Sequence, residues 1–318
     1  MNFLILSSSY CGNILYKQLK KEGHEVYLFN PYARTNGISI ISSIYLAFAN
    51  HIDCAIITDT GFIKEARIIS DKKIPVFGGQ ELQDKLELDL EAAEKLVRRY
   101  GARWLKDSTN VLLPLSTQIW FSNGNPLYKY IGYIKQTKFL TGDLGSDVDC
   151  ESCILWSYDN RNVEAVKRIF DHGLFDALYA IKYSGIFSID SFLSEDDKNP
   201  YIYAIKPRLE AGIISALLEI LDCNFGELIY NIATKTTASL STNENITCSV
   251  CISQPPYPYA QEGFIKYETS SGDNWLEARR NVGKKIRELN IKNIQYRTDA
   301  GYQGEHLDTL KRINYLSN

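Results

Sequence analysis

The sequence predicts an α/β protein whose first hundred residues form a parallel sheet. Short apolar runs alternate with amphipathic stretches at the start of the 318-residue chain. Longer runs of β-branched and aromatic residues dominate its middle, and a helix-periodic stretch lies near its end. Together these three observations predict a parallel-sheet domain, a sheet-rich central domain and a smaller α/β domain.

The first domain is expected to span residues 1–103. Strands that alternate with helices form parallel sheets covered on both faces, with ligands at the carboxyl ends of the strands. The expected strands are residues 3–6, 25–30, 54–60 and 74–79, with helices at residues 14–21 and 42–50 and between the last two strands. Apolar residues at helical spacing also predict one long helix over residues 81–100, which Gly101 ends.

Two loops of this domain are candidate substrate-binding sites. Ser7, Ser8 and Ser9 precede a helix, and Thr58 with Asp59 follows a later strand. Hydroxyls and backbone amides at the start of a helix can hold an anion. The same residue types also suit a helix cap and a turn, so both interpretations stay open.

The central domain is expected to span residues 104–240. A strand and hairpin at residues 116–127 lead to a glycine-containing loop, and glycines let backbone amides approach a ligand closely. The candidate substrate-binding residues of this loop are Thr141, Gly142, Asp143, Gly145 and Ser146. A helix is expected over residues 162–181.

Two cations follow the strands expected at residues 185–192 and 201–205. Lys206 and Arg208 stand at the end of the second strand, just before an apolar helix. Partly buried cations are costly to leave unpaired, and a phosphate or carboxylate ligand would satisfy them. A salt bridge to Glu210 or Asp190 is the alternative.

The last domain is expected to span residues 241–318, after a polar stretch at residues 236–245 that has no periodicity. A strand is expected at residues 247–253, and a helix followed by a strand at residues 277–301. Two Cys-x-x-Cys pairs begin at Cys150 and Cys248. Positions three apart on a strand point to opposite faces, so buried thiols are favoured over zinc and no metal site is predicted.

Composition limits the classes of function. The 38 acidic and 35 basic residues give a net charge of -3, which does not indicate tight non-specific nucleic-acid binding. No apolar run is long enough for a membrane helix, so no membrane partner is expected. Seven cysteines without an export signal favour a reduced, cytoplasmic compartment, which is the host cytoplasm if the chain is viral.

Three motifs occur in the order in which one enzyme family has them. The loop at residues 141–145 is similar to Thr-Gly-Gly-Met-Gly, and Arg208 matches the arginine of a Glu-Phe-Asn-x-Arg strand. Glu277-Ala-Arg and Tyr296-Arg-x-Asp-x-Gly complete the pattern. The chain thus resembles phosphoribosylamine-glycine ligase of the ATP-grasp superfamily. The resemblance implies an ATP-grasp-like fold with a Rossmann-like first domain, and its trimmed form would suit a bacteriophage homologue.

The parts with which that family handles ATP are changed or missing. Ala204 and Lys206 stand where it has glutamate and asparagine, and neither offers magnesium an oxygen ligand. Only residues 105–115 stand where it inserts a mobile lid, and Asp89 stands where it has a lysine that faces the nucleotide. The resemblance therefore implies a reduced ATP-grasp core that has lost ATP and magnesium, so no cofactor is predicted.

The family forms carbon–nitrogen bonds, and the chain is expected to be a related enzyme. Its partners would be an amino acid such as glycine and a phosphorylated or pyrophosphorylated nucleotide or base, for example thymine in modified phage DNA. Lys206 and Arg208 would be the catalytic cations. A non-catalytic binding protein and a conventional ATP-dependent ligase of purine biosynthesis are the alternatives. The sequence does not indicate an oligomeric state.

Overall fold

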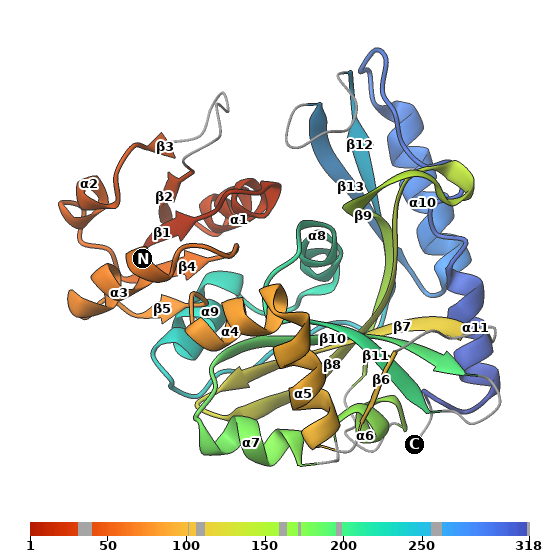
Figure 1. The fold of residues 1–318 in the computed structure, drawn as a ribbon. Helices are drawn as coiled ribbons and strands as arrows, with labels where there is room; N and C mark the ends of the chain where they lie inside the picture. The colour runs from red at the N-terminus through yellow and green to blue at the C-terminus, as the bar shows by residue number, and fades with distance from the viewer. Residues whose placement is uncertain are drawn as a thin grey trace.

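The protein is built from two β-sheets and the helices that cover them (Figure 1). A computed structural model describes residues 1–30, 40–100, 102–105, 112–158, 164–170, 173–194, 199–255 and 263–316. The five-stranded sheet lies in the first part of the chain, and an eight-stranded mixed sheet forms most of the remainder. The predicted α/β class is confirmed.

The first sheet is parallel, as the sequence predicts. Its strands in spatial order are β3 (Ile40–Ile41), β2 (Glu25–Phe29), β1 (Asn2–Leu6), β4 (Cys54–Ile57) and β5 (Val76–Phe77). Its helices are α1 (Tyr10–Lys21), α2 (Ile44–Phe48) and α3 (Ile63–Asp71). The chain order reverses between β1 and β4, so the loops that follow these two strands are brought together at one edge of the sheet.

The second sheet is mixed and runs through the central and last parts of the chain. Its strands in spatial order are β13 (Phe264–Gly272), β12 (Ile246–Ser253), β9 (Leu144–Tyr158), β8 (Asn125–Leu140), β7 (Leu112–Ser122), β10 (Gly185–Ser194), β11 (Pro200–Lys206) and β6 (Arg103–Trp104). The predicted hairpin is confirmed, because Asn123 and Gly124, both at positive φ, connect β7 to β8. Since β12 pairs with β9, the sheet continues past residue 240; the division into three domains stays a prediction.

Helices cover both faces of the second sheet, and the sheet separates two cores. On the face toward the parallel sheet, α8 (Ala211–Ile220) and α9 (Phe225–Ala233) share a core with α1. The helices of the opposite core are α4 (Glu81–Leu88), α5 (Leu90–Arg99), α6 (Glu164–Phe170), α7 (Leu174–Ala180), α10 (Trp275–Glu288) and α11 (Gly304–Arg312). Among the described helices, none is long and apolar enough to cross a bilayer.

Three predicted elements are wrong in detail. The helix expected over residues 81–100 is broken into α4 and α5, because Asp89 has an extended backbone and its carboxylate accepts from Ala92 N at 3.0 Å. The helix expected over residues 162–181 is α6 and α7, and Gly173, at φ 85°, precedes the second. The final strand does not form; Gln295 makes an isolated bridge instead.

Removing the Asp89 carboxylate tests whether this cap determines the break. Asp89→Ala leaves the first N–H groups of α5 without an acceptor, so we expect the free energy of unfolding to fall by about 1 kcal/mol. Denaturant unfolding followed by circular dichroism measures the change. Asp89→Asn keeps an acceptor and is expected to match the wild type. Equal stabilities of the alanine and asparagine variants would contradict the capping role.

Candidate functional site

A row of polar side chains crosses the middle of the large sheet. Tyr133 of β8 lies opposite Ser116 of β7, and Ser116 lies opposite Asp190 of β10. Asp190 lies opposite Ala204 of β11, beside a bulge in that pairing. Cross-strand partners point to the same face of a sheet. The row therefore lies on the face toward the parallel sheet, where Tyr133 joins the core shared with α1.

The Lys135 ammonium group reaches this row from β8 and contacts Asp190. Its Nζ is 2.8 Å from Asp190 Oδ2 and 3.1 Å from Glu210 Oε2, and Ser116 donates to Asp190 Oδ1 at 2.7 Å. Burial raises the pKa of the Asp190 carboxyl, but Lys135 and Lys206 outweigh burial and bring this pKa below its usual value. Burial lowers the pKa of Lys135, but the two carboxylates outweigh it and bring this pKa well above its usual value. Lys135 and Asp190 are therefore an ionised pair.

This arrangement does not fit a magnesium ion. Ala204, at the position of the glutamate in the resembled family, has no oxygen ligand, and it lies opposite Asp190, whose carboxylate is already paired with Lys135. A second cation placed there would be repelled by the ammonium group. Within the described ranges, no group of three or more His, Cys, Asp or Glu side chains is placed to hold a metal.

Lys206 is partly exposed and paired. Its side chain is 29% exposed, and its Nζ lies 3.1 Å from Glu210 Oε2. The sequence left a salt bridge to Glu210 open as an alternative, and the structure has that bridge. Glu210 also contacts Lys135, so one carboxylate joins the exposed lysine to the buried one. We call Lys135, Asp190, Lys206 and Glu210 the central site.

Arg208 connects the large sheet to the first part of the chain. Its buried guanidinium bonds to the Asp84 carboxylate, to Glu87 Oε2 at 2.5 Å and to the Asp59 carbonyl oxygen at 2.9 Å. These partners differ from Glu210 and Asp190, the salt-bridge partners that the sequence left open as an alternative. Burial raises the pKa of Glu87, and Arg208 offsets the shift only in part. The observed geometry makes Arg208 a clamp between segments, and its guanidinium is already satisfied by protein oxygens.

The two predicted loops of the parallel sheet meet at the carboxylate of Asp59. Its Oδ2 accepts from Ser7 Oγ and Ser8 N, each at 2.8 Å, from Thr58 Oγ1 at 2.7 Å and from Ser9 N at 3.3 Å. All five predicted residues are thus brought together. An external anion would need these same donors, but the Asp59 carboxylate already accepts from them. Ser9 also caps α1, because its hydroxyl oxygen accepts from Cys11 N.

The predicted glycine loop is the turn between β8 and β9, and it is exposed. Its contacts are Gly142 N to Asp299 Oδ2 at 2.9 Å, Thr141 Oγ1 to Thr298 Oγ1 at 3.2 Å and Asp143 Oδ1 to Arg297 Nη1 at 2.8 Å. Gly145 and Ser146 begin β9. The loop therefore binds the segment that carries the carboxyl-terminal motif, and a carboxylate of the chain again takes the glycine amide.

Sequence reasoning did not identify Lys135, although the sequence contains a signal for it. Lys135 is two residues beyond Tyr133 on an apolar strand, so both side chains are expected on the same face. A lysine on the buried face of a strand requires a partner, which predicts a carboxylate nearby. No local pattern could name Asp190 as that partner, because it comes from another strand.

The two sheets and their connections define the class of fold, which is ATP-grasp-like. Phosphoribosylamine–glycine ligase from Thermotoga maritima is similar to it, with a TM-score of 0.73 and 14% identity over 94% of this chain and 100% of that one. Biotin carboxylase from Campylobacter jejuni has a TM-score of 0.65 and 10% identity, and the match covers 100% of this chain and 96% of that chain.

N5-carboxyaminoimidazole ribonucleotide synthetase from Thermus thermophilus is a third similar structure, with a TM-score of 0.63 and 10% identity over 91% of this chain and 99% of that one. No family model matches the sequence, and no curated protein does. At these identities the similarity establishes the fold. The predicted ATP-grasp-like architecture is confirmed, and the chain has the fold of ligase enzymes.

The clamp can be tested by removing its charge. Arg208→Met leaves Asp84 and Glu87 partly buried without a cation, so we expect the free energy of unfolding to fall by about 3 kcal/mol. Chemical denaturation measures the change. Arg67→Met is the matched control, because Arg67 pairs with Glu81 on the surface, where an ion pair contributes about 1 kcal/mol or less. Similar losses in both variants would contradict the role of Arg208.

Proposed function

We propose that the protein is a ligase-like enzyme that forms a carbon–nitrogen bond without ATP. It joins an amino acid to an acceptor that already carries a phosphate or pyrophosphate leaving group. The main support is Lys135, whose ammonium group pairs with Asp190, and Asp190 lies opposite Ala204, where the resembled ligases have a metal-binding glutamate. An enzyme with a fixed ammonium in this place needs a substrate that is activated elsewhere.

The charges around the central site also argue against a nucleoside triphosphate. The carboxylates of this region are Asp59, Asp84, Glu87, Asp190 and Glu210, and its cations are Lys135, Lys206 and Arg208. The guanidinium of Arg208 is bound to protein oxygens and Lys135 is buried, so Lys206 is the one of these three cations that is partly exposed to the phosphate oxygens of a ligand. Only residues 105–111 separate β6 from β7, too few for a lid subdomain at that point.

Lys206 and Glu210 carry the proposed chemistry. The amine nitrogen of the amino acid, in its neutral form, attacks the activated carbon of the acceptor, the carbon–oxygen bond to the phosphate group breaks, and the leaving group departs with the bonding electrons. The Glu210 carboxylate takes the proton that the nitrogen then loses. Lys206 stabilises the negative charge of the leaving group. Arg208, between them in sequence, is a positioning residue in this proposal.

A non-catalytic binding protein is the second candidate. It is favoured by the internal carboxylates, because Asp59 and Asp299 already take the amides of the two predicted anion-binding loops. Such a protein would retain the scaffold without releasing a leaving group. Turnover separates the two candidates.

The ATP-independence predicts that Mg-ATP has no effect on thermal stability. A ligand that binds the native state raises the melting temperature according to its concentration and affinity. We expect no shift at millimolar Mg-ATP, measured by differential scanning fluorimetry, while an ATP-dependent phosphoribosylamine–glycine ligase serves as the positive control. A concentration-dependent rise for this protein would support the conventional ligase instead.

The reaction predicts release of pyrophosphate from DNA that contains pyrophosphorylated thymidine, in the presence of glycine or another amino acid. Lys206→Gln and Glu210→Gln should each lower the rate about 100-fold, because each removes a charge that acts on the reacting groups. A coupled pyrophosphate assay measures release. Lys311→Gln, on the exposed surface of α11, is the matched control and should keep the wild-type rate. No release with any amino acid would favour the binding protein.

A further inference from the structure

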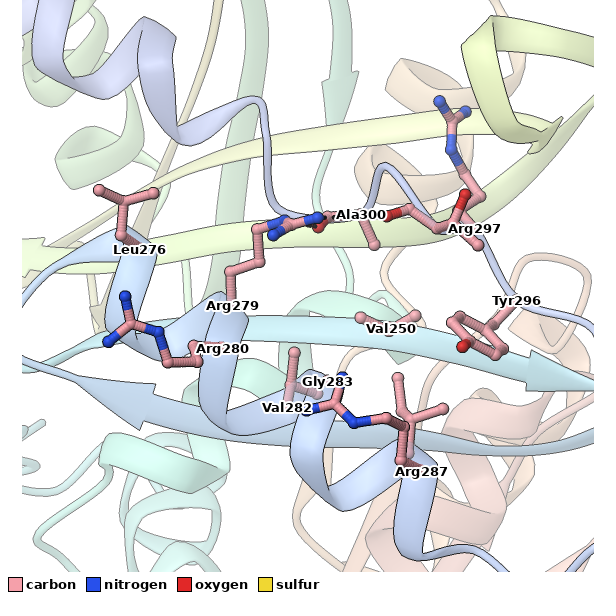
Figure 2. Close-up of a pocket in the computed structure, with 12 residues that line it drawn as sticks. Val250, Leu276, Arg279, Arg280, Val282, Gly283, Arg287, Tyr296, Arg297 and Ala300 are labelled. Carbon is pink, nitrogen blue, oxygen red and sulfur yellow. Dashed lines mark hydrogen bonds between the residues drawn. The ribbon is translucent and has the colours of Figure 1, made fainter.

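A second candidate binding site lies on the opposite face of the large sheet from the central site. Helix α10 packs there in the core that includes Val250 of β12, whereas α8 and Lys135 belong to the other face. A cavity of about 270 Å³ opens between α10 and residues 296–300 (Figure 2). Its volume is slightly below the range of small-molecule pockets, about 300–1,000 Å³.

Two arginines of this cavity are unpaired. Arg279 donates to the carbonyl oxygens of Ala300 and Thr298, and Arg297 is held by Asp299 and Asp143. Arg280 and Arg287, in contrast, are exposed, and across the part of the chain that the structure describes neither has a hydrogen-bond or ion-pair partner. Helix α10 has five basic and two acidic residues, so its own carboxylates are too few to neutralise Arg280 and Arg287.

Gly283 leaves the helix surface between these arginines bare. Arg280 and Arg287 are seven residues apart, which is two turns and the same side of a helix. Gly283 lies between them, and Arg287 Nη1 is 3.6 Å from the position that a β-carbon on Gly283 would have. Figure 2 shows the Arg287 guanidinium directed back toward Gly283. A β-carbon would therefore fit at Gly283, and glycine makes a helix about 0.5–1 kcal/mol less stable than alanine does. Neither packing nor helix stability thus explains the glycine at this position.

The remaining walls suit a planar ring. Val250, Val282 and Ile286 are buried apolar residues that line the cavity. Tyr296 provides an aromatic side chain next to Val250 (Figure 2). Guanidinium groups bind phosphate oxygens in a forked geometry, and aromatic side chains stack on nucleobases. A ligand with a phosphate at one end and a flat ring at the other matches both parts of the cavity.

We propose that this cavity, lined by Arg280, Gly283, Arg287 and Tyr296, binds a nucleoside monophosphate. The phosphate contacts the guanidinium groups above the bare surface of Gly283, and the base lies against Tyr296 and the apolar floor. This binding is separate from the reaction proposed for Lys206 and Glu210, because the sheet stands between the two sites.

Calorimetric titration with deoxythymidine 5′-monophosphate tests the proposal. We expect the wild type to bind it more tightly than inorganic phosphate or thymidine, since each of these offers one part of the ligand. Arg280→Gln and Arg287→Gln should each weaken binding at least 10-fold. Gly283→Leu, which fills the cavity with a good helix former, should abolish binding. Arg312→Gln on α11 removes an exposed arginine elsewhere and should leave the affinity unchanged.

The outcomes that would overturn the proposal are distinct from failure of the proposed reaction. Absence of binding to the wild type, unchanged affinity in Gly283→Leu, or an equal loss in Arg312→Gln would each refute a specific site on α10. Binding that is lost in Lys206→Gln but kept in Gly283→Leu would place the ligand at the central site. Affinity for the nucleotide no higher than for inorganic phosphate would show that the base makes no contact. Far-ultraviolet circular dichroism of each variant confirms that it is folded.

Discussion

The ion pairs of Arg208 are the contact on which the arrangement of the two sheets depends. Arg208 lies just beyond the end of β11 in the large sheet, and its guanidinium bonds to oxygens of α4 and of the loop after β4. Such a buried cation is stable only while its carboxylates stay in place. The same contact fixes the backbone between Lys206 and Glu210, so the geometry of the central site depends on the packing of the first part of the chain against the large sheet.

Internal carboxylates recur wherever the resembled ligases suggest an anion site. Asp59 takes the amides of the loop after β1, Asp84 and Glu87 take the guanidinium of Arg208, and Asp299 takes the amide of Gly142. Each carboxylate satisfies donors that would otherwise need water or a ligand as acceptor. Carboxylates of the chain itself therefore occupy the predicted anion-binding sites.

At the central site, the Lys135 ammonium group balances the charge of carboxylates, as a metal ion could. A divalent ion held by carboxylates and a lysine ammonium between carboxylates both neutralise buried negative charge, but only the metal can exchange and bind phosphate oxygens. The ammonium is covalently fixed, and its contacts with Asp190 and Glu210 keep it charged. The central site is therefore suited to positioning small charged groups, which is the basis of the ATP-independent function proposed for it.

Local patterns in the sequence were sufficient to predict the parallel sheet, because alternating strands and helices permit few topologies. They were also sufficient to predict the hairpin at Asn123 and Gly124, whose positive φ angles suit a tight turn. They also placed Ser7, Thr58 and Asp59 in loops after strands of the parallel sheet, and the structure makes these two strands neighbours. The sequence did not reveal the break at Asp89, since apolar spacing continues through it and only the cap interrupts the helix.

The sequence by itself determined the class of fold, the strands of the parallel sheet and the absence of metal-binding side-chain oxygens at residues 204 and 206. Tertiary structure alone decided the partners of the charged residues. Arg208 binds carboxylates more than a hundred residues earlier in the chain, and Lys135 binds one that comes two strands away in the sheet. The periodicity of apolar residues indicates which face of a helix or strand a side chain occupies. Charge pairing depends instead on the distant segments that tertiary packing brings within a few ångströms of each other.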